Sequence, residues 1–244
     1  MRISRLFTAQ PLVTSDSVAL TDATAHYLGK VLRVEPGHPL VLFNGDGLEY
    51  QAVVETVNKQ QVQVRVGAAS APATESALHT VLGLGISRGE RMDYAIQKST
   101  ELGVSVIVPL FTEHCEVKLS GERVDKRQAH WQQIAVSACE QSGRVKVPVI
   151  ETPQTLASWL GRAESGLRLL LDHEESGRLA GPRPAGGVSL LIGPEGGLSA
   201  AEIAAAKSAG FVGMRLGKRV LRTETAPVAA LSVLQYLWEE RETD

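Results

Sequence analysis

The chain has 244 residues, 43% of them hydrophobic and 21% charged, which is enough apolar material for one large or two modest globular domains. A net charge of −2 and an aromatic content of 5% argue against a generally basic nucleic-acid coat and against a broad base-stacking surface. Two cysteines are too few for a disulfide framework or a Cys-x-x-Cys zinc site, and the histidines show no metal-ligand spacing, so we expect no bound metal.

Residues 1–70 are predicted to form a small domain of short strands. Residues 39–43 are apolar, and the Asn-Gly-Asp-Gly sequence that follows favours a tight turn because Asn and Gly tolerate positive φ. Residues 61–66 alternate strictly between polar and apolar side chains, as a half-buried strand does. The pattern indicates a small β-barrel or sandwich. Residues 71–77, which are mostly small and include a proline, are interpreted as a linker.

From residue 78 to residue 244 the pattern changes to alternating strands and helices. Apolar runs predict strands at 80–86, 104–110, 167–171, 188–192 and 211–216. Helical spacing and end signals predict helices at 88–102, 125–142, 199–209 and 226–240. The sequence Ser199-Ala-Ala-Glu202 is typical of a capping box at the start of the third helix. Continuous apolar strands that alternate with helices indicate a parallel sheet covered on both faces.

Ligands of open α/β sheets bind at the carboxyl ends of the strands, which draws attention to the loop at residues 193–199. Its three glycines would let the backbone approach a ligand closely. No lysine follows them as in a phosphate-binding P-loop, and Glu195 would repel a phosphate. The loop therefore favours a neutral or cationic ligand with hydrogen-bonding edges. A tight turn with a solvated Glu195 is the alternative.

Two further segments carry clustered charge. Four basic residues fall between positions 215 and 222 without an acid among them, which is compatible with phosphate binding or with a solvated loop that Thr223 or Thr225 closes as a helix cap. Residues 86–91 contain Arg88 and Arg91, and Lys98 and Glu101 extend the charge along one helical stripe. Such a stripe forms either a solvated helix face or an RNA-docking surface.

Several enzyme classes lack their motifs in this chain. The dinucleotide fingerprint G-x-G-x-x-G is absent, because Arg88 stands at its last position, and there is no G-x-S-x-G nucleophile elbow. The glycine-rich loop of the common Rossmann-type methyltransferases is missing as well. No secretory signal and no apolar stretch of membrane-spanning length is visible, which predicts a cytoplasmic protein without a membrane partner.

Taken together, these segments resemble the SPOUT superfamily of methyltransferases. The resemblance rests on Leu-Ile-Gly-Pro-Glu-Gly-Gly at 191–197 and on Leu-Gly-Lys-Arg-Val-Leu-Arg-Thr-Glu-Thr-Ala at 216–226. More narrowly, the chain is similar to the bacterial 16S ribosomal RNA uridine-N3 methyltransferases, as residues 87–92, 97–103 and 138–144 agree with that family. Residues 26–33 resemble its PUA-like RNA-binding domain.

The resemblance implies an α/β fold with a small N-terminal PUA-like β-barrel at 1–70 and, at 78–244, a parallel-sheet methyltransferase domain with a C-terminal trefoil knot. It also implies a homodimer with S-adenosyl-L-methionine as cofactor. The implied reaction is methylation of N3 of a specific uridine in 16S ribosomal RNA, in the assembled small ribosomal subunit. The implied cofactor-binding residues are Leu171, Ile192, Gly193, Glu195, Gly196, Gly197, Leu216, Gly217, Val220, Leu221 and Thr225.

Uracil N3 carries a proton at neutral pH, so the reaction needs a group that removes it and a cation that stabilises charge on the neighbouring oxygens. We assign the cation to Arg222, and Glu224 and Glu101 are the available carboxylates. The implied RNA-binding residues are Arg2, Arg5, Lys30, Arg33, Arg88, Arg91, Lys98, Lys218 and Arg219.

Three other functions remain compatible with the sequence. A related SPOUT enzyme could methylate a ribose 2′-hydroxyl or another base. A non-catalytic ribosome-assembly factor could bind RNA and retain the cofactor pocket. A small-molecule α/β enzyme is the third, and tight RNA binding through the N-terminal half would argue against it.

Overall fold

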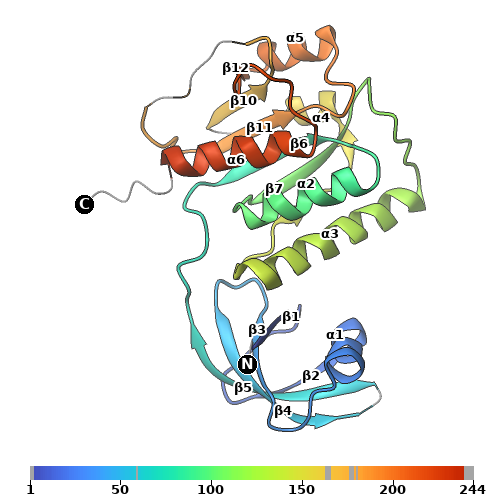
Figure 1. Cartoon of the computed structure of the whole chain (residues 1–244), viewed down its shortest axis with the longest axis vertical. Helices are drawn as coiled ribbons and strands as arrows, with labels where there is room; N and C mark the ends of the chain where they lie inside the picture. Colours follow the sequence, from blue (N-terminus) through green and yellow to red (C-terminus); the bar gives the residue numbers. More distant parts are fainter. Residues whose placement is uncertain (1–2, 59, 163–165, 176–178, 180, 239–244) are drawn as a thin grey trace. The chain divides into compact units, whose positions relative to one another are not determined.

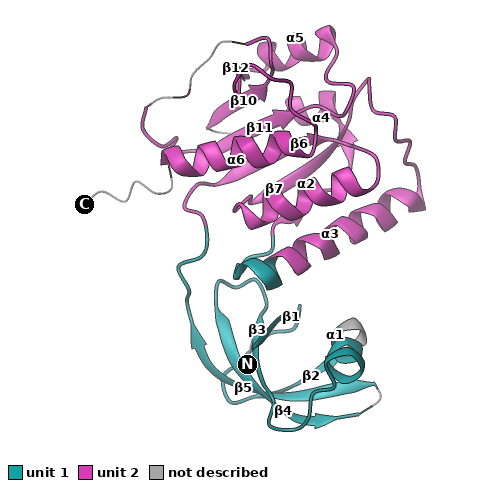
Figure 2. Cartoon of the chain, in the orientation of Figure 1, with its two compact units in different colours: residues 1–75, 139–147 teal, residues 76–138, 148–244 magenta. Residues whose placement is uncertain are grey.

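The computed structural model of the chain describes residues 3–58, 60–162, 166–175, 179 and 181–238 (Figure 1). Contacts within the chain define two compact units (Figure 2). Unit 1 contains residues 1–75 and 139–147, and unit 2 contains residues 76–138 and 148–244. The sequence pattern did not indicate that residues 139–147 group with the N-terminal residues, because residues 139–142 form the end of the helix predicted at 125–142 in the C-terminal domain.

Unit 1 is built on a five-stranded sheet with the order β1-β3-β4-β5-β2. Its strands are β1 (Ser4–Phe7), β2 (Ser17–Thr21), β3 (Pro39–Phe43), β4 (Glu49–Val57) and β5 (Gln61–Ser70). β1 and β3 are parallel and the other pairs are antiparallel. Val62, Val64 and Val66 are buried at every second position of β5, as the alternation predicted. α1 (Asp22–His26) continues directly into a π-helical turn, η1 (Tyr27–Leu32), which the sequence analysis did not foresee.

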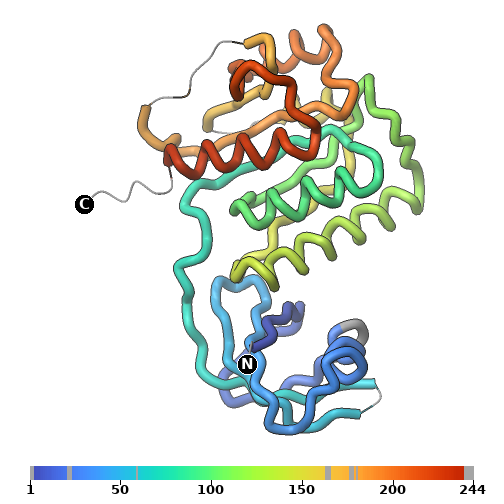
Figure 3. The backbone as a smooth tube through the Cα atoms, in the orientation of Figure 1, coloured from blue at the N-terminus to red at the C-terminus, as the bar shows by residue number. Residues whose placement is uncertain are grey.

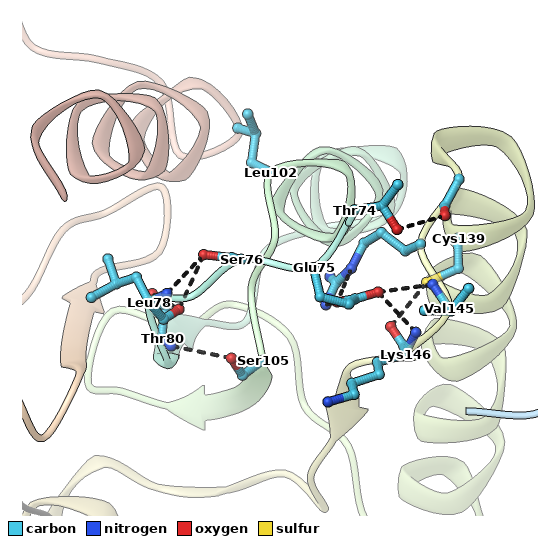
Figure 4. Close-up of polar contacts among 12 residues, drawn as sticks. Thr74, Glu75, Ser76, Leu78, Thr80, Leu102, Ser105, Cys139, Val145 and Lys146 are labelled. Carbon is cyan, nitrogen blue, oxygen red and sulfur yellow. Dashed lines mark hydrogen bonds and ion pairs between the residues drawn. The ribbon is translucent and has the colours of Figure 1, made fainter. Parts of the chain in front are cut away.

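Residues 139–147 are held in unit 1 by buried charge. The Arg5 guanidinium donates hydrogen bonds to the carbonyl oxygens of Cys139, Gly143 and Arg144 at 2.9, 3.2 and 3.2 Å. The Glu75 carboxylate accepts from the Arg144 guanidinium at 2.9 Å and from the N–H groups of Val145 and Lys146 (Figure 4). The Arg5 bonds satisfy carbonyl groups at the end of α3, and the Glu75 bonds satisfy N–H groups of the residues that follow it.

This environment corrects the prediction that Arg5 binds RNA. Its side chain is only 16% exposed, and it also lies 3.5 Å from the Glu49 carboxylate and over the Phe43 ring. A guanidinium with this many internal partners cannot turn to a phosphate without leaving buried acceptors unsatisfied.

Unit 2 is built on a parallel sheet of seven strands with the order β12-β10-β11-β6-β7-β8, in which β9 also pairs with β7. The strands are β6 (Thr80–Gly85), β7 (Val106–Phe111), β8 (Val149–Ile150), β9 (Gln154–Thr155), β10 (Leu167–Leu171), β11 (Val188–Ile192) and β12 (Val212–Met214). The helices are α2 (Glu90–Glu101), α3 (Glu122–Ser142), α4 (Leu156–Leu160), α5 (Ala200–Ser208) and α6 (Thr225–Trp238). All five residues of β11 are buried, as the continuous apolar run predicted.

These observations confirm the expected α/β class, with a small N-terminal β domain and a C-terminal parallel sheet. The capping box is confirmed, since Ser199 and Glu202 exchange both of its hydrogen bonds. α2 begins at Glu90 rather than at residue 88 because Gly89 precedes it with a φ of +47°. α4, β8 and β9 were not predicted, because elements of two to five residues are too short for periodicity to detect. No helix in the described part of the chain is long and apolar enough to cross a membrane.

Candidate active site

A cavity of about 560 Å³ lies at the carboxyl ends of β10 and β11, where the fold class predicts a ligand. Two segments enclose much of it: the loop after β11 and the segment that leads into α6. The backbone course of both segments can be followed in Figure 3. Apolar side chains contribute to the wall: Leu171 and Ile192 at the ends of β10 and β11, and Leu216 and Leu221 in the segment before α6. The two motifs on which the family resemblance rests therefore form much of the cavity wall, together with the end of β10.

The loop after β11 folds back so tightly that side chains would not fit. A Cβ on Gly85 in β6 would lie 2.4 Å from the Pro194 nitrogen, and a Cβ on Gly193 would lie 3.0 Å from backbone atoms of Gly197 and Leu198. The Gly197 N–H closes the turn by donating to the Pro194 carbonyl oxygen at 2.9 Å, and Gly197 has a φ of +70°. These glycines bring bare backbone to the cavity wall, where its polar groups can meet a ligand.

Glu195 connects this loop to the loop after β6. Its Oε1 accepts a hydrogen bond from the Arg88 N–H at 2.9 Å and lies 3.4 Å from the Arg91 guanidinium. Partial burial alone would raise the pKa of Glu195, but the hydrogen bonds from the Arg88 N–H, its own N–H and Arg91 outweigh it and lower the pKa. The carboxylate is thus ionised at neutral pH and acts as a tether, rather than as the solvated group of the alternative interpretation.

Thr223 connects three segments of the site instead of capping α6. Its hydroxyl lies 3.0 Å from the Ser87 hydroxyl and donates to the Gly193 carbonyl oxygen at 3.3 Å. Ser87 and Thr223 are both buried. They fix the segment before α6 against the ends of β6 and β11, so the neighbouring Arg222 and Glu224 are held at the cavity.

Arginines line the rim of the cavity. Arg91, Arg215, Arg219 and Arg222 all line it and are exposed. Arg91 is paired with Glu195, whereas Arg215, Arg219 and Arg222 form no ion pair with any residue that the structure describes. Unpaired guanidinium groups beside an open cavity are suited to phosphate or to a developing negative charge.

Inside the cavity the charge is reversed. Glu224 lines it, and its Oε2 is buried without a hydrogen-bond partner among the described residues. Asp172, which follows β10, also lines it, and its side chain is only 10% exposed. A cationic ligand would supply the missing countercharge, and the apolar walls and free backbone suit a flat ring with polar edges. The residues present therefore fit S-adenosyl-L-methionine, a sulfonium that carries an adenine.

The structure brings together most of the expected site residues. The cavity is lined by Leu171, Ile192, Gly193, Glu195, Gly196, Gly197, Leu216, Val220, Leu221, Arg222 and Glu224, and by Arg91 and Arg219 from the expected RNA set. Gly217, which has a φ of +74°, does not line the cavity, and neither do Thr225, Arg88, Lys98 and Lys218. Glu101 does not line it either and pairs with Lys98 at 2.7 Å, so we do not retain it as a candidate base.

Some site residues escaped the sequence analysis. Asp172 and His173 lie in a stretch that matched no motif, although their position directly after a buried strand was a signal. Thr223 and Ser87 were read as a cap and as part of a charged loop. In unit 1, Lys30 and Arg33 are exposed as expected, whereas Arg2 lies outside the described residues.

Comparison with known proteins identifies the family. Residues 74–235 match the model of the RNA methyltransferase domain, and residues 20–67 match the RNA methyltransferase PUA domain. The ribosomal RNA small subunit methyltransferase E of Buchnera aphidicola is 34% identical over 96% of this chain and 96% of its own. A crystal structure of the enzyme of that name from Neisseria gonorrhoeae, bound to S-adenosyl methionine, has a TM-score of 0.91 at 37% identity and covers 98% of this chain and 100% of its own.

A methyltransferase structure from Legionella pneumophila with bound SAM has a TM-score of 0.92 at 40% identity and covers 98% of this chain and 100% of that one. These similarities extend over both units and include the two motifs at the cavity. The chain therefore belongs to the RNA methyltransferase family of the ribosomal RNA small subunit methyltransferases E.

Proposed function

We propose that this chain methylates N3 of a specific uridine in 16S ribosomal RNA, with S-adenosyl-L-methionine as methyl donor. The observation that carries the proposal is the pair of unpaired charges on one short segment: the exposed Arg222 guanidinium and the buried Glu224 Oε2, both lining the cavity. The relatives named for small-subunit ribosomal RNA methylation, and the structures with bound cofactor, support the same reaction class.

The cofactor would lie in the cavity against the glycine loop. Backbone groups of Ile192, Gly193, Gly197, Leu216 and Leu221 would bind the adenine edges, with Leu171, Gly196 and Val220 completing the wall. When bound, S-adenosyl-L-methionine supplies an electrophilic methyl group. Glu195 would act indirectly by holding the loop in place, and Gly217 and Thr225 by shaping the segment on either side of Arg222.

Two side chains would prepare the uracil. N3–H lies between two carbonyl groups and is a poor nucleophile until it loses its proton. Glu224 would accept that proton on its unpartnered Oε2, and the Arg222 guanidinium would stabilise the negative charge that spreads onto the uracil oxygens. Because the two residues are two positions apart in a segment fixed by Thr223, their positioning is built into the fold.

The RNA would be held by exposed basic groups. Arg215 and Arg219 at the cavity rim and the neighbouring Lys218 would contact backbone phosphates, as would Lys30 and Arg33 of unit 1. N3 lies on the Watson–Crick edge, so the target base must be unpaired or flipped out of its stack. The substrate would be the assembled small subunit, in the cytoplasm.

The finer architecture is also proposed. The segments that enclose the cavity would be threaded as a trefoil knot, and two chains would form a homodimer. Exposed aromatic side chains on neighbouring helices support an apolar interface: Tyr94 on α2 is 47% exposed and Tyr236 on α6 is 71% exposed.

The reaction is tested by incubating the protein with labelled S-adenosyl-L-methionine and small ribosomal subunits from cells that lack it, followed by mass analysis of the nucleosides. Label in 3-methyluridine would support the proposal. Label in a 2′-O-methyl nucleoside would retain the fold and change the acceptor, and RNA binding without any label would favour an assembly factor.

A further inference from the structure

The loop that follows β7 packs against the glycine loop of the cavity, residues 193–199, although it does not itself line the cavity. In this loop the His114 imidazole lies with its Nδ1 2.9 Å from the Gly196 carbonyl oxygen. A carbonyl oxygen only accepts hydrogen bonds, so Nδ1 carries a proton and donates it. The bond joins two loops of unit 2 that are 82 positions apart in the sequence.

Gly196 also fits His114 in shape. A Cβ on Gly196 would lie 2.8 Å from the His114 Cβ and 3.4 Å from the His114 carbonyl oxygen. Because carbon atoms pack best at about 3.5–4.0 Å, the first of these distances is a clash. Gly196 does not have a positive φ, so its backbone conformation alone does not require a glycine. The close approach of His114 therefore accounts for the glycine at position 196.

A second contact holds the same two loops together. The Glu202 carboxylate accepts a hydrogen bond from the Glu113 N–H at 2.8 Å through Oε1 and from the Ser199 N–H at 2.9 Å through Oε2. The contact with Ser199 is half of the capping box that begins α5, directly after the glycine loop. One carboxylate thus fixes the end of the glycine loop to the residue that precedes His114.

The residues that these contacts hold belong to the cavity wall. Glu195, Gly196 and Gly197 all line the cavity. Glu195 is bonded to Arg88 in the loop after β6, and Gly196 is bonded to His114 in the loop after β7, so adjacent residues are held by two different neighbours. A loop whose backbone is fixed before it meets a ligand loses less conformational freedom on binding, which raises the affinity for that ligand.

We propose that His114 is a positioning residue for the cofactor. Its imidazole fixes the Gly196 carbonyl group, so that the glycine loop offers a preformed backbone surface to the adenine of S-adenosyl-L-methionine. His114 acts through the loop and does not touch the cofactor, because its side chain does not line the cavity. The inference rests on the proposed function, since it takes S-adenosyl-L-methionine as the ligand of the cavity.

The first test measures the dissociation constant of S-adenosyl-L-methionine by calorimetry on the full chain. His114→Ala removes one neutral hydrogen bond and should weaken binding about fivefold. His114→Asn should restore most of the affinity, because the asparagine amide nitrogen and Nδ1 are the same number of bonds from Cβ, whereas His114→Gln carries its amide one bond further and should not. His79→Ala is the matched control, since His79 is exposed at the amino end of β6 and its ring bonds to no described residue. Wild-type affinity in His114→Ala, or equal affinity in the Asn and Gln variants, would overturn the proposal.

The second test separates the loop from the reacting group. S-adenosyl-L-homocysteine carries the same adenine without the positive charge, so His114→Ala should weaken its binding by the same factor. In turnover, His114→Ala should raise KM for the cofactor about fivefold and leave kcat unchanged. A loss confined to the sulfonium, or a fall in kcat alone, would overturn the proposal. If the wild-type chain bound the cofactor and methylated no RNA, the proposed function would fail while the binding data still decided the role of His114; no cofactor binding at all would overturn both.

Discussion

Arg5 in unit 1 and Arg222 in unit 2 carry the same guanidinium group, but the fold uses the two differently. Arg5 is 16% exposed and donates hydrogen bonds to several backbone carbonyl oxygens, so its guanidinium is already occupied by partners within the chain. Arg222 is exposed beside a cavity and forms no ion pair with a described residue. The contrast separates charge that holds the chain together from charge that remains available to a substrate.

Two carboxylates repeat the contrast. Glu75 of unit 1 accepts from Arg144 and from two backbone N–H groups. Glu224 of unit 2 has a buried Oε2 without a partner among the described residues. An unpaired buried polar atom lowers the stability of the folded chain. A ligand that bonded to the Glu224 Oε2 would recover this free energy on binding. Sequence composition cannot make this distinction, since both residues are glutamates in short connecting segments, Glu75 between β5 and β6 and Glu224 directly before α6.

Removal of Arg222 should give the largest effect on activity. Loss of a donor that stabilises developing charge lowers kcat by about 10²–10³-fold, so Arg222→Ala should lose that much turnover while the free energy of unfolding stays within about 0.5 kcal/mol. Arg222→Lys retains the charge without the planar fork and should recover part of the rate. Turnover is measured on small subunits at saturating cofactor. Near-normal turnover in Arg222→Ala would remove Arg222 from the mechanism.

Glu75→Gln should have the complementary phenotype. The Arg144 side chain is 6% exposed, so loss of its carboxylate partner leaves a buried charge and should lower the free energy of unfolding by about 3 kcal/mol. Cofactor affinity at temperatures where the chain remains folded should not change. Glu122→Gln is the control, because Glu122 is 89% exposed in its pair with Lys126 and should cost almost nothing. Equal denaturation midpoints for the two variants would refute the distinction between the units.

Gly85→Ala tests whether the cavity depends on the close approach of backbone to backbone. The added Cβ would stand 2.4 Å from the Pro194 nitrogen and must push the glycine loop aside. Overpacking of this kind costs about 1–3 kcal/mol, so cofactor affinity measured by calorimetry should fall by about tenfold or more. Gly29→Ala is the control, since its Cβ would meet a Val57 methyl at an ordinary 3.6 Å. Unchanged affinity would mean that the loop does not position the cofactor.

The sequence predicted β6, β7, β10, β11 and β12 of unit 2 because buried parallel strands are uninterrupted apolar runs, whereas the two-residue strands β8 and β9 were missed. The residue at which α2 begins and the whole of η1 were missed, since a glycine with positive φ and a π-helical turn leave no distinctive spacing. The two motifs predicted most of the cavity wall, because glycines and charges at strand ends have few other uses.

The roles of the charged residues were predicted less well. Arg5 and Glu195 carry charges that sequence alone assigns to solvent or ligand, yet both bind parts of the chain that are distant in sequence. Glu195 lies 107 positions from Arg88, and Arg5 lies 134 positions from Cys139. Long-range partners of this kind follow from tertiary structure and have no local pattern.

The Glu195 tether gives a pH dependence with a definite sign. Its pKa is lowered by bonds that exist only in the folded chain, so its contribution to stability is complete above the ordinary carboxyl value of 4.5 and is lost as the pH falls through the lower folded value. The difference in unfolding free energy between the wild-type chain and Glu195→Gln should therefore be constant above pH 4.5 and should shrink below it. A difference that grew on acidification would contradict the tether.

The smallest expected effect concerns the reactivity of the two cysteines, which alkylation measures in the wild-type chain without any substitution. Burial raises the pKa of Cys139 to about 12, and Cys115, which is only partly buried, has a pKa raised chiefly by burial as well. The thiolate is the reactive form, so iodoacetamide at neutral pH should modify Cys115 slowly and leave Cys139 intact until unit 1 opens. In Glu75→Gln the contacts that hold residues 139–147 in unit 1 are weakened, because the Arg144 guanidinium and the Val145 N–H lose their carboxylate acceptor. Cys139 should therefore become reactive at a lower denaturant concentration than in the wild-type chain, and peptide mass analysis would detect its alkylation. Labelling of Cys139 in the native wild-type chain would mean that the paired charges around residues 139–147 do not keep this part of unit 1 closed to solvent. The contrast between paired charges in unit 1 and unpaired charges at the cavity would then not correspond to a difference in stability.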